Sequence, residues 1–520
     1  MKKLLTIGLS FASVCLQAQY RSIVFFADKP VQEHFALSPE SSERRARAGV
    51  FYNETDWPVN PLYIKQLAEP GVKVVGVSRW LNAAMVQHNH ALPLSKWKGV
   101  KQVVMLKKRQ QARSTMGSSL VPAPAGLASD KNQVLHHAEL LDSLQLKGEG
   151  IYIAIFDAGF QGVDTTAAFR HLFSEQRLRF TRDVVNGANV FQYDEHGTQV
   201  YSIIGAQLPG RYEGLAPMAQ VALFVTENVF SETQTEEFNW VVAAETADSL
   251  GVQLINSSLG YTEFDDPSTD YTTDKMDGKT AISTQGARMA AQKGILVVNS
   301  AGNYRQQSWG KMGAPSDADS ILSVGALLLD SAVASFSSPG PTADGRIKPD
   351  VSSLGVRTAA VNRRGELVES NGTSFAAPLV AGLCTALWSQ NPLLSAQEVR
   401  RRLMTSSHLS QNPNNDMGYG IPDMRKALNL FSEPIPFQTA RLYPNPGSQM
   451  LFLQVGEFSG SVSVELLSSN GGLIDKQELT VASQQEIDLS VFCQRIPQSG
   501  TYFIRITEGD KQRTFSWVAK

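Results

Sequence analysis

The stretch TAISTQGARMAAQKGILVV, residues 280–298, sets the pattern for the middle of the chain. It has the length and composition of a helix as far as Lys293, followed by Gly294 and by the apolar run Ile295 to Val298. Glycine suits the left-handed position that closes a helix. A short run that is almost wholly apolar is typical of a strand buried on both faces. The stretch therefore predicts a helix that leads directly into a buried strand.

The same alternation extends from about residue 130 to residue 430. A second segment of helical length, Phe238 to Leu250, ends before Gly251, and further apolar runs lie on either side of it. Alternating strands and helices predict a doubly wound, mostly parallel α/β sheet. Functional sites of such sheets form at the carboxyl ends of the strands. The strand candidates are Ile151–Phe156, Val221–Val225, Val252–Ile255, Ile295–Val298 and Ile321–Val324.

Two flanking segments have other patterns. Residues 19–115 mix strand-like runs such as Val100 to Leu106 with charged helical stretches such as Ser41 to Ala48, which predicts a small α+β unit. Residues 435–520 have no helix signal, and several of their runs alternate apolar and polar residues, which predicts a β-sandwich. The strand candidates of that segment are Leu451–Val455, Ser461–Leu467, Leu473–Thr480, Glu486–Val491, Thr501–Ile506 and Arg513–Val518.

The first residues, 1–18, have the features of a signal peptide. Lys2 and Lys3 precede the apolar run Leu4 to Leu16, and Ala18 is a small residue before the expected cleavage point. This pattern predicts that the chain is exported.

A polar, basic stretch runs from Lys107 to Ser114 and has no apolar period, so it is predicted to be a linker. It is either a solvated loop or a region where the chain is processed. Its charge does not decide between these two interpretations.

Composition excludes several classes of protein. Among 520 residues, 47 Lys and Arg oppose 49 Asp and Glu, a net charge of −2, so no nucleic-acid partner is expected. Three cysteines are too few for a disulfide scaffold or a cysteine-rich zinc site. After the N-terminus, no apolar stretch reaches the roughly 20 residues of a membrane helix, so no transmembrane helix is expected in the mature chain.

Three polar side chains stand where chemistry is expected. Asp157 directly follows a buried strand, so the sheet would fix its carboxylate. His196 is followed by Gly197, which leaves space beside an exposed ring. Asn303 follows another buried strand, where its amide could donate to an oxyanion. Each of these residues, taken alone, is more simply read as a turn, a cap or a loop residue.

Ser374 lies in Asn371-Gly372-Thr373-Ser374-Phe375-Ala376-Ala377-Pro378, ahead of a small, apolar helix. The start of a helix offers free N–H groups and the positive end of the dipole, which favour negative charge on a bound carbonyl oxygen. Serine is also a common helix cap. A cap does not explain the small residues around it or Gly372, which lets a peptide approach closely.

Taken together, Asp-x-Gly, His-Gly-Thr, Ala-Gly-Asn and Gly-Thr-Ser-x-Ala-x-Pro resemble the motifs of the subtilisin-like serine proteases, across roughly residues 130–432. The order Asp, His, Ser is the triad order of subtilisin. The resemblance implies that Ser374 is the nucleophile, that His196 is the general base and acid, and that Asp157 orients His196. It also implies that Asn303 and the Ser374 N–H form the oxyanion hole.

The resemblance further implies a substrate cleft. Ser258, Leu259 and Gly260 would form the strand that borders it, and Ser300, Ala301 and Gly302 the opposite wall. The chain departs from the family in two places: Ala158 replaces the usual Ser or Thr after the aspartate, and Ser352-Ser353-Leu354-Gly355 replaces a small Ala-Pro-Gly. The second departure is expected to alter a loop near the site.

The flanking segments also resemble known modules. The α+β unit stands where subtilases carry a propeptide, although a mature interaction domain is the alternative. Residues 435–520 resemble the sorting domain of type IX secretion substrates of Bacteroidetes-like bacteria. The alternative is an adhesion or carbohydrate-binding sandwich. The motifs of the sorting domain are Tyr443-Pro444-Asn445-Pro446, Gly500-Thr501-Tyr502 and the terminal Lys520.

The resulting expectation is a zymogen of a secreted serine endopeptidase that acts on protein or peptide substrates through an acyl-enzyme. It would reach the medium or the cell surface via the periplasm and the type IX machinery. The alternative is a catalytically silent surface binding protein with the same fold. No cofactor is expected, and the resemblance leaves structural calcium open without identifying its ligands.

Overall fold

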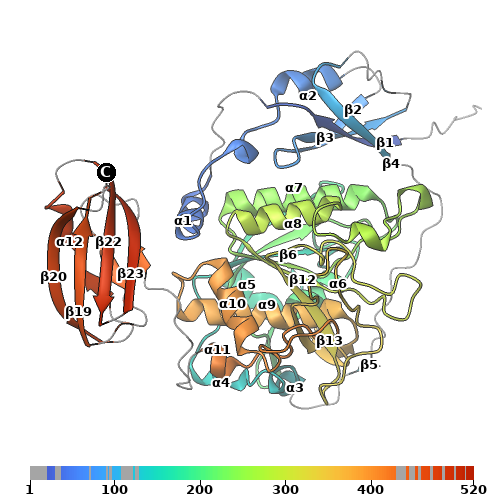
Figure 1. The fold of residues 1–520 in the computed structure, drawn as a ribbon. Helices are drawn as coiled ribbons and strands as arrows, with labels where there is room; N and C mark the ends of the chain where they lie inside the picture. Colours follow the sequence, from blue (N-terminus) through green and yellow to red (C-terminus); the bar gives the residue numbers. More distant parts are fainter. Residues whose placement is uncertain are drawn as a thin grey trace, which may run out of the picture. The chain divides into compact units, whose positions relative to one another are not determined.

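The computed structural model describes residues 20–29, 37–68, 72–89, 92, 97–106, 121–122, 128–428, 441–443, 451–454, 458, 460–468, 472–482, 486–496, 499–509 and 511–519. The chain divides into two compact units, Met1–Leu430 and Phe431–Lys520 (Figure 1). The expected signal peptide, the basic linker from 107 to 114, most of the motif that starts at Tyr443 and the terminal Lys520 lie outside the described residues.

A seven-stranded sheet forms the centre of the first unit, in the order β14-β13-β12-β11-β6-β10-β7. Its neighbouring strands pair in parallel, which confirms the predicted sheet. Within this sheet, the first strand along the chain is the inner strand β6. The chain then forms β10 and β7 on one side of β6 and crosses to β11 on the other side. This reversal places the carboxyl ends of β6 and β11 side by side, where such folds bind ligands. The strands are β6 Tyr152–Asp157, β7 Leu178–Asp183, β10 Gln220–Val225, β11 Leu254–Ser257, β12 Leu296–Ser300, β13 Leu322–Leu327 and β14 Val351–Leu354.

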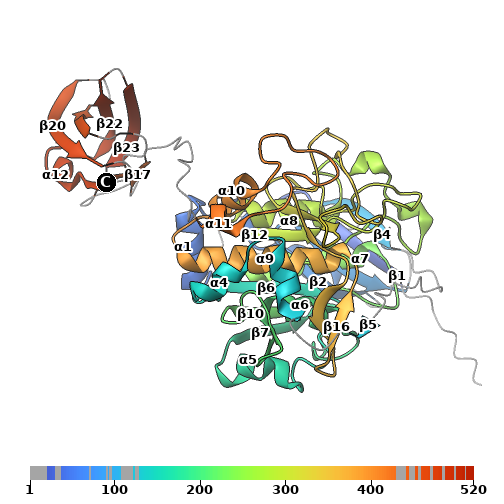
Figure 2. The same cartoon turned by 90° about the horizontal axis from the view of Figure 1, so that it is seen from below.

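Helices cover both faces of this sheet. On one face lie α7 (Gln234–Leu250) and α8 (Ile282–Gln292), and on the other lie α6 (His196–Gly205) and α9 (Thr373–Gln390) (Figures 1 and 2). Strand β6 shows the alternation that this requires. Its residues Ile153 and Ile155 pack with the α6 and α9 side, and Ala154 and Phe156 pack with the α7 and α8 side. The shorter helices of this region are α3 Ala128–Val134, α4 Glu139–Ser143, α5 Arg170–Ser174, α10 Ala396–Ser406 and α11 Met424–Ala427.

Both predicted glycine positions follow their helices in the left-handed conformation, with φ of 87° at Gly251 and 84° at Gly294. Helix α7 begins four residues before the predicted start. Thr233 accepts the N–H of Thr235, and the Glu236 side chain accepts the N–H of Thr233 in return, which forms a capping box. The first turn of the helix is polar, so the apolar pattern of the sequence does not indicate where the helix starts.

Three of the four residues at the second departure from the family, Ser352 to Leu354, lie in a strand, and the expected change to a loop near the site stays a prediction. Ser352 to Leu354 belong to strand β14 at the edge of the sheet, and all of its side chains are buried. Their hydroxyls are satisfied there, because Ser352 donates to the Met417 carbonyl (3.2 Å) and Ser353 bonds to the His136 ring (2.7 Å). Small polar residues with such partners form a buried strand without an apolar run.

The N-terminal segment folds into an α+β unit, as predicted, and the structure shows that its sheet is antiparallel and that two α-helices accompany it. The sheet order is β2-β3-β1-β4, and it packs against α7 (Figure 1). Its residues Ile23, Trp80 and Met85 share one core with Phe238 and Trp240 of α7. The elements are β1 Tyr20–Phe26, α1 Pro39–Arg47, α2 Pro61–Leu67, β2 Val72–Ser78, β3 Ala83–His88 and β4 Val100–Leu106.

The second unit has two sheets around one core, in the orders β17-β18-β21 and β20-β19-β22-β23. It corrects one prediction, because the strand expected to reach Val491 ends at Asp488 and the helix α12 (Ser490–Cys493) follows. The Asp488 carboxylate accepts the N–H of Ser490 (2.8 Å), which turns the chain. The strands are β17 Arg441–Tyr443, β18 Phe452–Gln454, β19 Gly460–Leu467, β20 Leu473–Val481, β21 Glu486–Asp488, β22 Gly500–Glu508 and β23 Lys511–Ala519. None of the helices in the described ranges has the length and apolarity that a membrane span requires.

Candidate active site

Asp157 and His196 meet at the carboxyl end of β6. Asp157 is the last residue of β6 and is fully buried, and His196 is the first residue of α6. The His196 Nδ1 lies 2.8 Å from the Asp157 Oδ1, so the ring donates to the carboxylate when Nδ1 carries the proton. The Asp194 carboxylate accepts the backbone N–H of His196 (2.6 Å). Gly197 allows this approach, because a Cβ there would lie 2.8 Å from the Asp157 Cβ.

The charge around His196 favours its protonated form. Burial by itself lowers the pKa of the ring, but the Asp157 charge, the hydrogen bond to Asp157 and the Asp194 charge together raise the pKa above the usual 6.5. The ring therefore holds a proton more readily than a free histidine does. This is what a residue needs in order to take a proton from a hydroxyl.

Ser374 is the second residue of α9 and is bonded to the end of β11. Its Oγ donates to the Ser258 carbonyl (3.2 Å), and the Ser258 Oγ donates to the Ser374 carbonyl (2.9 Å). The His196 ring lies 5.6 Å from the ring of Phe375, the next residue along α9. The structure thus brings α6 and the start of α9 together.

Asn303 is held beside the start of α9. Its Oδ1 accepts from the Thr373 N–H (3.0 Å) and from the Thr373 hydroxyl (3.1 Å), and that hydroxyl accepts the N–H of Gly302 (3.2 Å). A Cβ at Gly372 would lie 3.6 Å from the Asn303 Nδ2. Because its oxygen is engaged, Asn303 has its Nδ2 end available to donate to a substrate oxygen.

The two expected walls of the cleft lie side by side after β11 and β12. The Leu259 carbonyl accepts from the Asn299 Nδ2 (3.1 Å) and the Ser300 hydroxyl (3.5 Å). The Gly260 carbonyl accepts from the Tyr304 hydroxyl (3.2 Å). The remaining residues of the second wall, Ala301 and Gly302, are buried at the end of β12.

Sequence reasoning missed the residues that hold the site in place. Thr373 could have been identified, because it lies within the Gly-Thr-Ser motif. Asp194 stands two residues before His196, but nothing in its surroundings distinguishes it. Asn299 and Tyr304 lie at the two ends of the Ser-Ala-Gly-Asn motif. Their hydrogen bonds to the carbonyls of Leu259 and Gly260 join segments that are distant in the sequence, so the motif does not indicate them.

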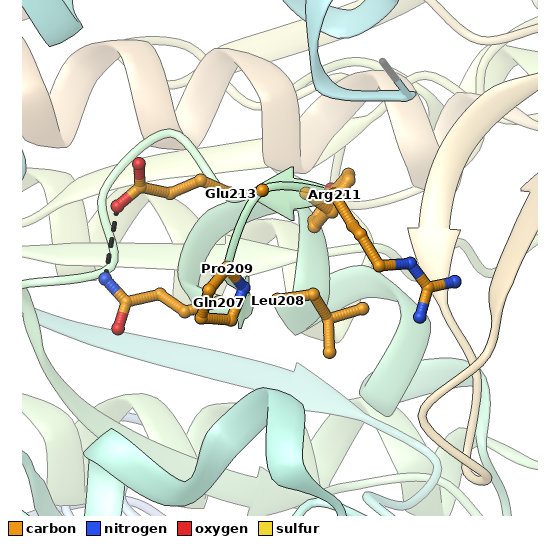
Figure 3. A pocket seen from close by; sticks show the side chains of 7 residues that line it. Gln207, Leu208, Pro209, Arg211 and Glu213 are labelled. Atoms are coloured by element: carbon orange, nitrogen blue, oxygen red, sulfur yellow. Dashed lines mark hydrogen bonds between the residues drawn. The ribbon is translucent and has the colours of Figure 1, made fainter. Parts of the chain in front are cut away.

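A hollow of about 450 Å³ lies elsewhere, at the turn between β8 (Gln207–Leu208) and β9 (Tyr212–Glu213). Figure 3 shows Gln207 and Glu213 facing one another there, with the amide donating to the carboxylate over 3.1 Å. Its lining, residues 207–213, includes no residue of the site described above. We therefore assign the hollow no part in the site.

A metal has no ready position in the described part of the chain. The His, Cys, Asp and Glu side chains that the structure describes form no group of three or more arranged to hold an ion.

Two flanking regions match family models. Residues 21–119 match the "Peptidase S8 propeptide domain, Bacteroidota", and residues 441–520 match the "Secretion system C-terminal sorting domain". These matches confirm both resemblances that the sequence motifs indicated. A chain that carries this sorting domain is a secreted or cell-surface protein.

Several known proteases are similar to this chain. It is 26% identical over 316 residues to the membrane-bound transcription factor site-1 protease of Rattus norvegicus, which covers 58% of this chain and 27% of that protein. It is 27% identical over 328 residues to serine protease AprX of Bacillus subtilis (strain 168), which covers 55% and 69%. The solved structure of MycP1 from the ESX-1 type VII secretion system matches with a TM-score of 0.47 and 19% identity, over 62% of this chain and 91% of that chain.

The chain thus spans about a quarter of the length of the site-1 protease. Residues 148–420, just over half of the chain, match the model described as "Subtilase family", and every residue of the site lies within that range. The chain therefore belongs to the subtilase family.

Proposed function

We propose that the protein is a secreted serine endopeptidase whose catalytic residues are Asp157, His196 and Ser374. The observation that carries this proposal is the 2.8 Å bond between His196 and the buried Asp157. The histidine faces the start of the helix that carries Ser374. A buried carboxylate that orients a histidine beside a serine at a helix start is the arrangement that activates a hydroxyl nucleophile.

In this mechanism, the Ser374 Oγ attacks the scissile carbonyl while the His196 Nε2 takes its proton. Asp157 keeps the Nδ1 proton in place and stabilises the imidazolium. The Asn303 Nδ2 and the Ser374 N–H donate to the oxyanion. The tetrahedral intermediate collapses as His196 passes its proton to the leaving amine. Water, activated by His196, then hydrolyses the acyl-enzyme.

The flanking segments would be temporary parts of this enzyme. The proposed division is a signal peptide at 1–18, a propeptide at 19–115, the peptidase at 130–432 and the sorting domain at 435–520, which the type IX machinery would recognise. The family matches at 21–119 and 441–520 support this division.

The experiment compares Ser374→Ala with Ser308→Ala, a control at an exposed serine. Hydrolysis of casein and of a chromogenic peptide is measured after expression of the full chain. We expect Ser374→Ala to abolish hydrolysis and Ser308→Ala to leave it unchanged. A wild-type chain that folds but hydrolyses neither substrate would instead support the silent binding protein.

A further inference from the structure

A group of carboxylates lies next to the expected substrate strand. We call Glu227, Glu232, Glu236 and Asp265 the acidic wall. The Asp265 N–H donates to the Glu232 carbonyl (2.8 Å), which joins two of the loops that carry the wall. The Tyr261 hydroxyl donates to the Glu227 carboxylate (2.6 Å). Tyr261 directly follows Gly260, so this bond ties the wall to the expected substrate strand.

Asp265 is the part of the wall that most needs a ligand. Asp265 is only 6% exposed, and both of its carboxylate oxygens are buried without a hydrogen-bond partner. Buried carboxylates are normally paired, because removal of a charge from water is costly. An unpartnered carboxylate among other acids therefore indicates a position for a cation.

Electrostatics link the wall to both sides of the catalytic site. Burial, and then the charges of its neighbours, raise the pKa of Glu232 and of Glu236 well above the usual value. Burial is the main cause of the raised pKa of Glu227 and of Tyr304, with smaller contributions from the Asp157 charge to the first and from the Glu232 charge to the second. Tyr304 is the residue whose hydroxyl holds the Gly260 carbonyl. The bonds of Tyr261 to Glu227 and of Tyr304 to Gly260 thus connect the neighbourhood of the wall to residues 258–260.

The N-terminal unit already brings one basic side chain near the wall. The charge of Glu236 acts on Arg21 of β1 and opposes the lowering of its pKa by burial. Arg21 pairs across the sheet with Leu106 at the end of β4. In the sequence, Leu106 is followed directly by Lys107, Lys108 and Arg109.

We propose that the acidic wall binds the side chain of a lysine or arginine in the peptide substrate, and so selects substrates that are basic close to the scissile bond. A guanidinium or ammonium group would supply the donors that Asp265 lacks. This inference rests on the proposed function, since it needs a peptide held in the cleft.

The test uses active enzyme from the full chain and a set of fluorogenic peptides. Members of each pair differ only by arginine or norleucine at one position near the scissile bond. We expect the wild type to prefer arginine at one of these positions. Asp265→Asn should lower kcat/KM for that arginine peptide by about 10- to 100-fold, the value of a charge-assisted hydrogen bond, and leave the norleucine peptide unchanged. Glu263→Gln, at an exposed neighbour, should keep the wild-type preference.

Two results would overturn the proposal. One is a wild type without preference for arginine at any position. The other is an equal loss of kcat/KM on both peptides in Asp265→Asn and in a second variant, Glu232→Gln. Such an equal loss also overturns the proposal when calcium raises the Tm of the wild type but not of the two variants. Covalent labelling by a serine-directed phosphonate is measured alongside. Labelled enzyme that lacks the preference refutes only the acidic wall, whereas a chain that is not labelled refutes the proposed function.

Discussion

At the scale of single residues, hydrogen bonds to neighbouring residues hold the side chains of the site in place. His196 is held by Asp157 through its ring and by Asp194 through its backbone. The sequence predicts the four principal residues because their motifs and their order are distinctive, and the structure shows the expected bond between two of them, Asp157 and His196. The rotamer of Ser374 could not be predicted, because the hydrogen bond to the Ser258 carbonyl depends on how β11 and α9 meet in space.

The first prediction concerns Asp157→Asn. In the proposed mechanism, neutral His196 is the base, and its pKa is raised, so the acid limb of kcat/KM for the wild type should lie above pH 6.5. The variant loses the carboxylate charge, so we expect that limb to move to lower pH. We also expect kcat to fall by about 10⁴-fold, as for the same change in chymotrypsin-type enzymes.

The measurement is a pH–rate profile, with Asp164→Asn at an exposed aspartate as the control. An acid limb that stays in place in Asp157→Asn would show that another group sets it.

The second prediction separates Asn303 from the residue that positions it. Asn303→Ala should lower kcat by about 10²–10³-fold with little change in KM, the loss known for the matching asparagine of subtilisin. Thr373→Val removes the hydroxyl that bonds to Asn303 and Gly302, so it should lower kcat in part.

Thr373→Ser restores the hydroxyl and should recover the activity. Steady-state kinetics on one peptide test all three variants. Equal activity of the valine and serine variants would exclude this positioning role.

At the scale of elements, a buried ion network joins the N-terminal unit to α7. Asp248 of α7 accepts from Arg44, Arg45 (2.5 Å) and Arg79 (3.2 Å). Asp56 bonds to Arg45 and to Lys293, each over 2.8 Å. The Asp248 side chain is fully buried. Its loss would take the carboxylate partner from buried Arg44, whereas Arg45 would keep Asp56 and Arg79 would keep Glu245.

The third prediction is that Asp248→Asn weakens the packing of the N-terminal segment, residues 20–106, against helix α7. Loss of one partner of a buried ion pair costs about 3–5 kcal/mol. The change is made in a Ser374→Ala background, so that the chain stays intact, and the Tm is measured by calorimetry. The control is Glu43→Gln in α1, whose carboxylate is exposed. A Tm equal to that of the control would mean that the network contributes no stability.

The strands and helices also show how far apolar patterns reach. Five of the seven strands of the central sheet were predicted, because they are buried and apolar. β7 escaped prediction because it is an edge strand with several exposed polar residues, and β14 because it contains two serines. Both segments form strands because they pair with a neighbouring strand, β10 for β7 and β13 for β14, and their own composition does not indicate it.

At the scale of the whole molecule, stability should depend on pH through His136. This residue is fully buried and bonds to the Pro422 carbonyl (3.0 Å) and to Ser353 (2.7 Å). Burial lowers its pKa to about 4. The folded protein therefore disfavours the proton that the unfolded chain binds below pH 6.5.

The fourth prediction is that His136 costs stability as the pH falls from 6.5 to 4, at about 1.4 kcal/mol per pH unit. His136→Gln, which keeps hydrogen-bonding groups, should lack this slope. The measurement is urea unfolding of both proteins across that range. A constant difference in the free energy of unfolding between them would contradict the prediction.

The central claim is that Ser374 is the nucleophile of a peptidase, and peptide mapping of an inhibited enzyme tests it most directly. The active protein is treated with a serine-directed phosphonate, digested and analysed by mass spectrometry. Our account predicts a single adduct, on Ser374, that forms in step with the loss of peptide hydrolysis. An adduct on another serine, or full loss of hydrolysis while Ser374 stays unmodified, would contradict it.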